Sequence, residues 1–366
     1  MLTVGVLFGG RSGEHDVSLC SAASVVAAMD PGKYNVVAIG IARDGRWYVQ
    51  DRPVIVDDKD FGRILKLEKK GTWFINHFEE GGKLVLFDAE SNRKVSVDVV
   101  FPAVHGTYCE DGTLQGLLEL AMVPYVGADS VGSSIGIDKD VTKRLLRDSG
   151  IPVVPWKTVI REDWLRDSGT ILKNIEEELS MPLFVKPART GSSVGVKKVK
   201  ARAELREAIE FSFQYDTKLL VEIGIEAREI ECSVLGNNEP RASILGEVRT
   251  RHEFYSYESK YIDPDGAELV IPAPLDPAVS DTIRAAAVKG YGVLCCGGMA
   301  RIDFFLDKNT GEYYLNEINT LPGFTSISMY PKLWAQTGIE YAALIDRLVE
   351  LALERHRARM NIRTEL

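Results

Sequence analysis

The sequence predicts a protein of mixed α/β and α+β class, with two or three domains. Strand and helix patterns alternate through the first third, which favours a parallel, Rossmann-like sheet with helices on both faces. A small α+β module follows, and the last third again combines strands with helices. The chain has 366 residues and is 45% hydrophobic, so it is too long for one compact core.

The first predicted domain covers residues 1–127. LTVGVLFGG is a buried-strand pattern, and the helical pattern VSLCSAASVVAAM and the strand YNVVAIGI follow it. VSVDVVFPAVHG, GTLQGLLELAMV and PYVG then give a strand, a helix and a short extended piece. The stretch at about 43–95 is polar and carries Gly81-Gly82 and mixed charges, so we interpret it as an insertion on this sheet.

The second domain is predicted over 128–221 and the third over 222–366. The second begins with a basic helix in GIDKDVTKRLLRDSG, and continues with the strand PLFVKPA, a Gly/Ser loop, the strand VGVKKVK and the helix AELREAIEFSFQY. The third is expected to contain strands at 229–235, 241–248 and 268–272, a helix at about 277–291, a hairpin, and a terminal helix from about 339.

The hairpin is predicted from ARIDFFLDKNTGEYYLNEINTLPGF, residues 300–324, with its turn at 308–311. Side chains two apart on a strand share a face, so Arg301 accompanies Asp303, and Glu317 accompanies Asn319. If Asp303 lies opposite Glu317, two carboxylates stand about 5 Å apart and require a cation. Because oxygen ligands suit Mg²⁺ that is shared with phosphates, we predict Asp303, Glu317 and Asn319 as metal ligands, with Arg301 facing an adjacent anion.

A second candidate site is the Gly/Ser loop of FVKPARTGSSVGVKKV, which follows Lys186. It is either an anion cradle of backbone N–H groups and hydroxyls or a plain hairpin loop. Lys139 and Lys143 lie four apart on one helix, a spacing typical of a solvated basic face. The arginines near the C-terminus receive the same interpretation; they are Arg355, Arg357, Arg359 and Arg363.

Two further motifs have more than one interpretation. RHEFYSYESKY, residues 251–261, is either an edge strand or a mobile lid that excludes water. G-x-S-x-G occurs at 132–136 and at 191–195, but a nucleophile elbow needs a strand before the serine and a helix after it. The first match lacks a convincing strand and the second lacks the helix, so a hydrolase is disfavoured.

The amino-acid composition limits the cellular compartment and the classes of partner that we expect for this protein. The net charge of −9 argues against a nucleic-acid binder. Five cysteines form no even framework, which favours a reducing compartment. We also expect no signal peptide and no membrane span, and hence a cytoplasmic protein.

Six motifs, in order along nearly the whole chain, resemble the D-alanine–D-alanine ligase family of the ATP-grasp superfamily. They are LFGGRSGEHDVSL, HGTYCEDGTLQGLLEL, FVKPARTGSSVGV, FYSYESKY, ARIDFFL and NEINTLPGFTSISMYP. The resemblance implies an ATP-grasp fold, in which two α+β domains clasp ATP behind a Rossmann-like N-terminal domain. One departure is Cys109, which replaces a glycine usual in the family; if that position has a positive φ, the cost is about 1–2 kcal/mol.

The resemblance also implies the site residues. ATP contacts are implied for Lys139, Lys186, Ser192, Ser193, Glu222, Ile225 and Glu229. D-alanine contacts are implied for Glu14, His105, Lys260, Arg301, Ser328 and Met329, and Glu110 belongs to the same signature as His105. The catalytic residues would be Glu14, Ser192, Tyr261, Arg301 and Gly323, with Asp303, Glu317 and Asn319 as ligands of one or two Mg²⁺ or Mn²⁺ ions.

The activity implied is the ATP-dependent joining of two D-alanine molecules through a D-alanyl phosphate, for peptidoglycan precursor synthesis. A homodimer that acts on small molecules is expected from the same resemblance. A D-alanine–D-lactate or D-alanine–D-serine ligase on the same fold is the alternative, and Tyr261 at the lid position favours an amine acceptor. A non-catalytic nucleotide-binding module is the rival from another class, but no metal ligand or phosphate lysine is missing from the sequence.

Overall fold

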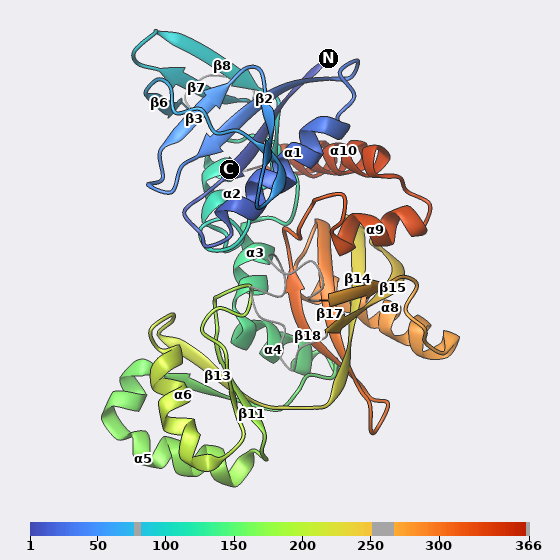
Figure 1. The fold of residues 1–366 in the computed structure, drawn as a ribbon. Coiled ribbons are helices and arrows are strands. Elements are labelled where there is room, and N and C mark those ends of the chain that lie inside the picture. The colour runs from blue at the N-terminus through green and yellow to red at the C-terminus, as the bar shows by residue number, and fades with distance from the viewer. Residues whose placement is uncertain (77–81, 251–266, 364–366) are drawn as a thin grey trace.

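Three larger sheets follow one another in the molecule, as the computed structural model in Figure 1 shows. The structure describes residues 1–76, 82–250 and 267–363. The N-terminal sheet lies at one end with the C-terminal helix α10 (Tyr341–Met360), and a four-stranded sheet lies at the other end. A five-stranded sheet lies between them. The mixed α/β and α+β class predicted from the sequence is therefore confirmed.

The N-terminal sheet has the strand order β3-β2-β1-β9. Its strands are β1 (Leu2–Gly9), β2 (Tyr34–Ile41), β3 (Trp47–Gln50) and β9 (Val99–Pro102), and its helices are α1 (His15–Ala28) and α2 (Thr113–Leu120). β1 pairs in parallel with β2 and β9, as predicted, whereas β3 pairs with β2 in the antiparallel direction. A short connection between neighbouring strands allows only antiparallel pairing, so the sheet is not wholly parallel.

The stretch at 43–95 forms several strands. It supplies β3, the hairpin of β4 (Ile55–Asp58) and β5 (Gly62–Leu65), and the antiparallel sheet of β6 (Trp73–Asn76), β7 (Leu84–Asp88) and β8 (Arg93–Val97). Leu65, Leu84 and Val97 are fully buried in the same hydrophobic core as β1. β3 is an edge strand of the N-terminal sheet, and these side chains complete the N-terminal core, while the interpretation of 43–95 as an insertion stays a prediction.

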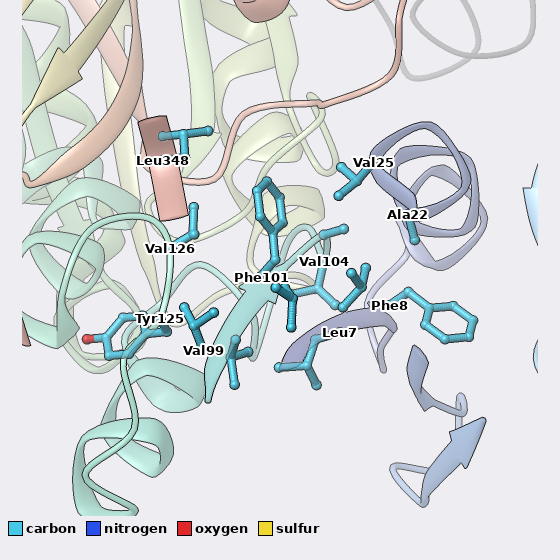
Figure 2. Packing of buried hydrophobic residues seen from close by; sticks show 14 of the residues in the cluster. Leu7, Phe8, Ala22, Val25, Val99, Phe101, Val104, Tyr125, Val126 and Leu348 are labelled. Atoms are coloured by element: carbon cyan, nitrogen blue, oxygen red, sulfur yellow. The ribbon is translucent and has the colours of Figure 1, made fainter. Parts of the chain in front are cut away.

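The C-terminal helix α10 completes the same core. Figure 2 shows Leu348 of α10 in one cluster with Val126, Phe101 and Leu7. Tyr34 also donates a hydrogen bond of 2.7 Å from its hydroxyl to Asp346 of this helix. The two ends of the chain thus meet in one apolar cluster.

The four-stranded sheet is antiparallel throughout, in the order β10-β13-β11-β12. This part contains α3 (Ser130–Ile137), α4 (Lys139–Asp148), β10 (Trp156–Ile160), α5 (Arg161–Glu178), β11 (Leu183–Pro187), β12 (Lys197–Val199), the 3₁₀ turn η1 (Arg202–Glu204), α6 (Leu205–Ser212) and β13 (Lys218–Ile223). α5 was not among the expected elements. Its pattern is interrupted at Asp167, which has a non-helical backbone conformation inside the helix.

The five-stranded sheet has the order β16-β15-β14-β17-β18. Its elements are β14 (Ala227–Gly236), β15 (Arg241–Thr250), β16 (Ala267–Val270), α8 (Pro277–Val293), β17 (Gly298–Asp307), β18 (Tyr313–Asn319) and α9 (Met329–Gln336). β17 and β18 form the predicted hairpin, and the predicted strands and helix of this region are found close to their expected limits. The division at 1–127, 128–221 and 222–366 stays a prediction.

No helix within residues 1–76, 82–250 and 267–363 is both long enough and apolar enough to cross a membrane.

Candidate active site

One large cavity, of about 1740 Å³, brings together residues from α1 and the loops beside the N-terminal sheet with residues of the four-stranded and five-stranded sheets. It is lined by every described residue that the sequence analysis singled out for a site: Glu14, His105, Lys139, Lys186, Ser192, Ser193, Glu222, Ile225, Glu229, Arg301, Asp303, Glu317, Asn319, Gly323, Ser328 and Met329. Lys260 and Tyr261, together with the RHEFYSYESKY motif, lie outside the described residues. The strand ends and loops that carry these side chains therefore converge on one space.

A buried carboxylate with two lysines forms one wall of the cavity. Glu222, on β13, accepts a hydrogen bond of 2.7 Å from Lys186 on β11, and Lys143 on α4 lies 3.2 Å from its other oxygen. Burial alone would raise the pKa of Glu222, but Lys143 and Lys186 outweigh it and lower this pKa to about 2. The carboxylate is therefore charged, and each of its oxygens has a lysine beside it.

The hairpin of β17 and β18 supplies the acidic wall. Asp303 stands opposite Glu317, and Arg301 opposite Asn319, so the predicted register is confirmed. Arg301 donates two hydrogen bonds of 2.8 Å to the two oxygens of Asp303, and Asn319 donates one of 3.0 Å. Lys139 lies 3.7 Å from Glu317. Each carboxylate of the pair is thus compensated by a cation of the protein.

The Gly/Ser loop contacts the start of α1. It joins the antiparallel strands β11 and β12, as predicted, and Ser192 donates a hydrogen bond of 2.6 Å to Glu14, 178 residues away. Lys139 holds the start of the loop by donating to the carbonyl of Thr190 at 2.8 Å. Gly106 makes room for Glu14, because a Cβ there would stand 2.5 Å from its carboxylate. A loop far along the chain and the first signature motif therefore form one edge of the cavity.

His105 is buried beneath Glu14. One ring nitrogen lies 2.9 Å from the Ser21 hydroxyl, and the other lies 3.1 Å from the Leu321 carbonyl and 3.7 Å from the carboxylate of Glu110. Burial alone would lower the pKa of His105, but Glu110 outweighs it, so this pKa is raised. Burial raises the pKa of Glu110. The carboxylate of Glu110 therefore favours the protonated form of His105.

The turn before α9 places Gly323 beside Ser328. A Cβ on Gly323 would stand 3.2 Å from the Ser328 hydroxyl, which also accepts a hydrogen bond of 3.1 Å from the Thr325 N–H. Met329 begins α9 and is buried. This end of the cavity combines backbone N–H groups, a hydroxyl and an apolar side chain.

Comparisons with known proteins agree with this geometry. The family models for the D-Ala-D-Ala ligase N-terminus and C-terminus match residues 3–128 and 145–350. The chain belongs to the D-alanine–D-alanine ligase family. It is 47% identical to the D-alanine–D-alanine ligase A of Escherichia coli K12, over all of this chain and 99% of that one.

Solved structures of the family have the same fold. The D-alanine-D-alanine ligase of Coxiella burnetii is 36% identical, with a TM-score of 0.79 over 98% of this chain and 97% of that one. The VanG D-Ala:D-Ser ligase of Enterococcus faecalis is 34% identical, with a TM-score of 0.80 over 96% and 99%. The resemblance seen in the six motifs is confirmed, and the protein is a ligase with the ATP-grasp fold.

The structure decides three questions that single motifs raised, and it corrects the first of these interpretations. Lys139 and Lys143 do not form a solvated basic face, since their side chains are only 15% and 1% exposed. The first G-x-S-x-G lies inside α3, so its serine is not on a strand-to-helix turn. The left-handed backbone conformation falls on Tyr108 (φ +65°) and not on Cys109, so the family's glycine is not replaced at a strained position.

The interpretation of the C-terminal arginines as solvated is wrong for Arg355. It donates to the carbonyl oxygens of Gly127 and Tyr125, the latter at 2.8 Å, and its guanidinium lies 4.7 Å from the Tyr125 ring centroid. Arg359 pairs with Glu119 at 3.0 Å. These arginines connect α10 to the N-terminal part of the ligase.

Sequence reasoning missed two residues of the cavity region. Lys143 was seen only as a surface cation, although its place one helical turn after Lys139 puts both on the same face. Glu231, which lines the cavity from β14, lies 3.0 Å from Arg301. The alternation of Glu229 and Glu231 in AREIECSVLG was the signal that could have placed both on one strand face.

The residues present fit a nucleotide and a divalent cation. No three His, Cys, Asp or Glu residues in the described part of the chain form a metal site by themselves. Asp303, Glu317 and Asn319 offer hard oxygen atoms, and such a partial set suits Mg²⁺, which takes its other ligands from water and phosphate. Lys139 and Lys186 lie on the same cavity and suit those phosphates.

Proposed function

We propose that this ligase joins two D-alanine molecules to D-alanyl-D-alanine, releasing ADP and phosphate, for peptidoglycan precursor synthesis. The observation that carries the proposal is the single cavity that unites the lysines, the acidic hairpin, Glu14 and the turn at Gly323. The names of the relatives at 47% identity support the same substrate. In the proposed arrangement, ATP lies between the subdomains of 128–221 and 222–366.

ATP is proposed to activate the first D-alanine. A carboxylate is a poor acyl donor because attack would expel oxide, whereas the acyl phosphate has a good leaving group. Lys139 and Lys186 would neutralise the phosphates during transfer, and Ser192 and Ser193 would close over them. Glu222 would take part in holding the adenosine; Ile225 and Glu229 are proposed for the same task. Mg²⁺ or Mn²⁺ held by Asp303, Glu317 and Asn319 would supply further positive charge to the phosphates.

The second step is attack by the amine of the second D-alanine on the acyl carbon. The developing oxyanion would be stabilised by the Arg301 guanidinium and the Gly323 N–H, and removal of one such donor typically costs about 3–4 kcal/mol. Phosphate then leaves with the bonding electrons, and the amine loses its proton. Water must be excluded meanwhile, because it would hydrolyse the acyl phosphate.

The amino acids are proposed to bind at the two ends of this centre. Glu14, supported by the Ser192 hydrogen bond and the adjacent His105, would hold the ammonium of the first D-alanine. Ser328 and Met329, together with Lys260, would receive the carboxylate of the second. Tyr261 is proposed as the lid residue.

The test is ADP release by the purified protein with Mg·ATP and D-alanine, L-alanine, or D-alanine plus D-lactate or D-serine, with products identified by mass. Dipeptide formed from D-alanine alone, and absent with L-alanine or without the metal, is the expected result. ADP release that ignores D-alanine would overturn the substrate. Glu14→Gln should abolish dipeptide formation, whereas Asp16→Asn, which alters only a surface pair with Arg43, serves as the control.

The proposal also names the acceptor, which is the second substrate that attacks the acyl phosphate. The likeness to a D-Ala:D-Ser ligase keeps D-serine as an alternative acceptor, and D-lactate is the other alternative that the same assay tests. Tyr261→Phe is expected to increase the use of D-lactate relative to D-alanine, and an unchanged product ratio would contradict this role. A homodimer in the cytoplasm is also proposed, and light scattering on the purified protein would test its oligomeric state.

A further inference from the structure

Glu231 belongs to a row of three carboxylates that crosses three neighbouring strands. In the sheet register, Glu231 of β14 stands opposite Asp303 of β17, and Asp303 stands opposite Glu317 of β18. Residues paired in this way have their side chains about 5 Å apart on one face. Glu231 therefore flanks Asp303 on the side away from Glu317 and Asn319.

Arg301 is shared between two of these carboxylates. Its Nε lies 2.8 Å from one oxygen of Asp303 and 3.0 Å from an oxygen of Glu231, while Nη2 lies 2.8 Å from the other oxygen of Asp303. The Arg301 and Glu231 side chains are 21% and 12% exposed. The N–H of Nε is donated to Asp303, so the contact with Glu231 is an ion pair without a hydrogen bond, and because it is partly buried, salt screens it less than a surface pair.

Both oxygens of Asp303 are engaged by donors of the protein. Arg301 donates to each of them, and Asn319 donates to the same oxygen as Nη2. Arg301 and Asn319 use both lone pairs of one Asp303 oxygen and one lone pair of the other, and a divalent cation bound at the remaining position would be repelled by the adjacent guanidinium. The pairing of Arg301 with Asp303 therefore competes with cation binding at Asp303.

Glu231 gives Arg301 a second partner that does not compete. It lies on the β14 side of Asp303, whereas the other proposed ligands lie on β18. When a cation replaces Arg301 at Asp303, Nε of Arg301 can keep its contact with Glu231. The guanidinium then remains at the cavity.

We propose that Glu231 is a positioning residue that holds Arg301 when Asp303 exchanges this arginine for a divalent cation. The inference deepens the proposed function, because it rests on the roles proposed there for Arg301 and Asp303. In this arrangement, binding of the cation at Asp303 is coupled to the change of Arg301 from Asp303 to Glu231 as its partner. Without the Glu231 charge, Asp303 is the only carboxylate within the described residues that still contacts Arg301 directly, so cation binding at Asp303 becomes weaker.

The experiment measures Mn²⁺ binding by the electron paramagnetic resonance signal of free Mn²⁺, with a non-hydrolysable ATP analogue and without D-alanine. Glu231→Gln is expected to raise the Kd for Mn²⁺ about tenfold, the scale of coupling between contacting charged groups. The Kd of the analogue without metal should not change. Glu231→Asp, which keeps the charge, should restore part of the Mn²⁺ affinity.

Glu247→Gln is the matched control. Glu247 is a buried carboxylate on the adjacent strand β15, but it pairs with Arg228 at 2.7 Å and with Arg249 at 3.1 Å and does not contact Arg301. A merely structural effect of losing a buried carboxylate would appear in both variants. Only Glu231→Gln should change the Kd for Mn²⁺.

Arg301→Met, alone and together with Glu231→Gln, completes a double-mutant cycle. It should tighten Mn²⁺ binding, and in its presence Glu231→Gln should have no further effect on the Kd. An unchanged Kd in Glu231→Gln, an equal change in Glu247→Gln, or an effect that persists without Arg301 would overturn the inference. Because D-alanine is absent, failure of the D-alanine ligation assay leaves this result unaffected, so the two failures are distinguishable.

Discussion

At the scale of single residues, the charge of Glu222 depends on two lysines. Taking a carboxylate out of water is costly, and only close cations compensate for it. Lys143 provides one of them and also donates a hydrogen bond of 3.0 Å to the Val154 carbonyl, with its ammonium 5.4 Å from the Trp156 ring centroid. Lys143 thus forms an ion pair with Glu222 from outside the cavity lining, whereas Lys186 lines the cavity.

Lys143→Met should therefore lower the free energy of unfolding by about 3 kcal/mol, because it leaves a buried carboxylate with one partner. It should also raise the KM for ATP. Urea denaturation and steady-state kinetics measure the two effects. Arg144→Met, whose side chain is 60% exposed, is the control and should cost less than about 1 kcal/mol. A double variant with Glu222→Leu should be more stable than Lys143→Met; equal stability would contradict the explanation.

The loop at Tyr108 and Cys109 gives a second prediction. Cys109 is buried and has no positive φ, so Cys109→Gly should lower the free energy of unfolding by about 1–2 kcal/mol. Tyr108→Gly relieves a left-handed conformation but loses a contact with Arg11 at 5.3 Å, so it should change stability by less than about 1 kcal/mol. Urea denaturation of both variants compares them. A gain in stability from Cys109→Gly would show that position 109 requires glycine.

At the scale of elements, the start of α4 sets the position of Lys139. Asp138 is the N-cap of this helix and accepts a hydrogen bond of 3.2 Å from the Val141 N–H. It also accepts one of 2.7 Å from Lys218 on β13. One side chain therefore begins the helix and ties it to the sheet that carries Glu222.

Asp138→Ala should cost about 2 kcal/mol of stability, since it removes both the cap and the partner of Lys218. Because Lys139 is the first residue of α4, the KM for ATP should rise as well. Asp138→Asn keeps the cap, so its loss of stability and its rise in the KM for ATP should both be smaller. Thermal unfolding and steady-state kinetics measure the two quantities. Equal losses in the two variants would mean that the cap does not matter.

At the scale of the whole molecule, α10 fastens the end of the chain to its beginning. Arg359 donates a hydrogen bond of 3.2 Å to Glu119 of α2 and forms a second ion-pair contact with it at 3.0 Å, and Glu119 also accepts from Tyr125 and Ser130. Burial alone would raise the pKa of Glu119, but Arg359, Tyr125 and Ser130 outweigh it and lower this pKa to about 2. One carboxylate therefore joins α2, α3 and the last helix.

A lowered pKa makes this contribution depend on pH in a defined direction. The stability from Glu119 is present above its ordinary pKa of 4.5 and is lost as pH falls from there toward about 2. Glu119→Gln should therefore be less stable than the wild type by about 1–2 kcal/mol at pH 7 and approach it as pH falls below 4. Chemical denaturation at several pH values measures this. A difference that is constant from pH 7 to pH 3 would contradict it.

Local patterns in the sequence determined much of the candidate site. The hairpin of β17 and β18 follows from alternating side chains around a turn, and these features fix the register of Asp303 and Glu317. The strands flanking the Gly/Ser loop are likewise set by short-range patterns. The six motifs identified the family, because their residues and order are carried by the chain itself.

Other features were decided only when distant segments met. The sequence shows Lys143 as one more helical lysine, and only the packing of α4 against β10 and β13 buries it beside Glu222. It does not show that Glu231 faces Arg301, because β14 and β17 are far apart in the chain. Nor does it show that α10 completes the N-terminal core. Side-chain periodicity is a local property, whereas burial and ion pairing depend on which segments the fold brings together.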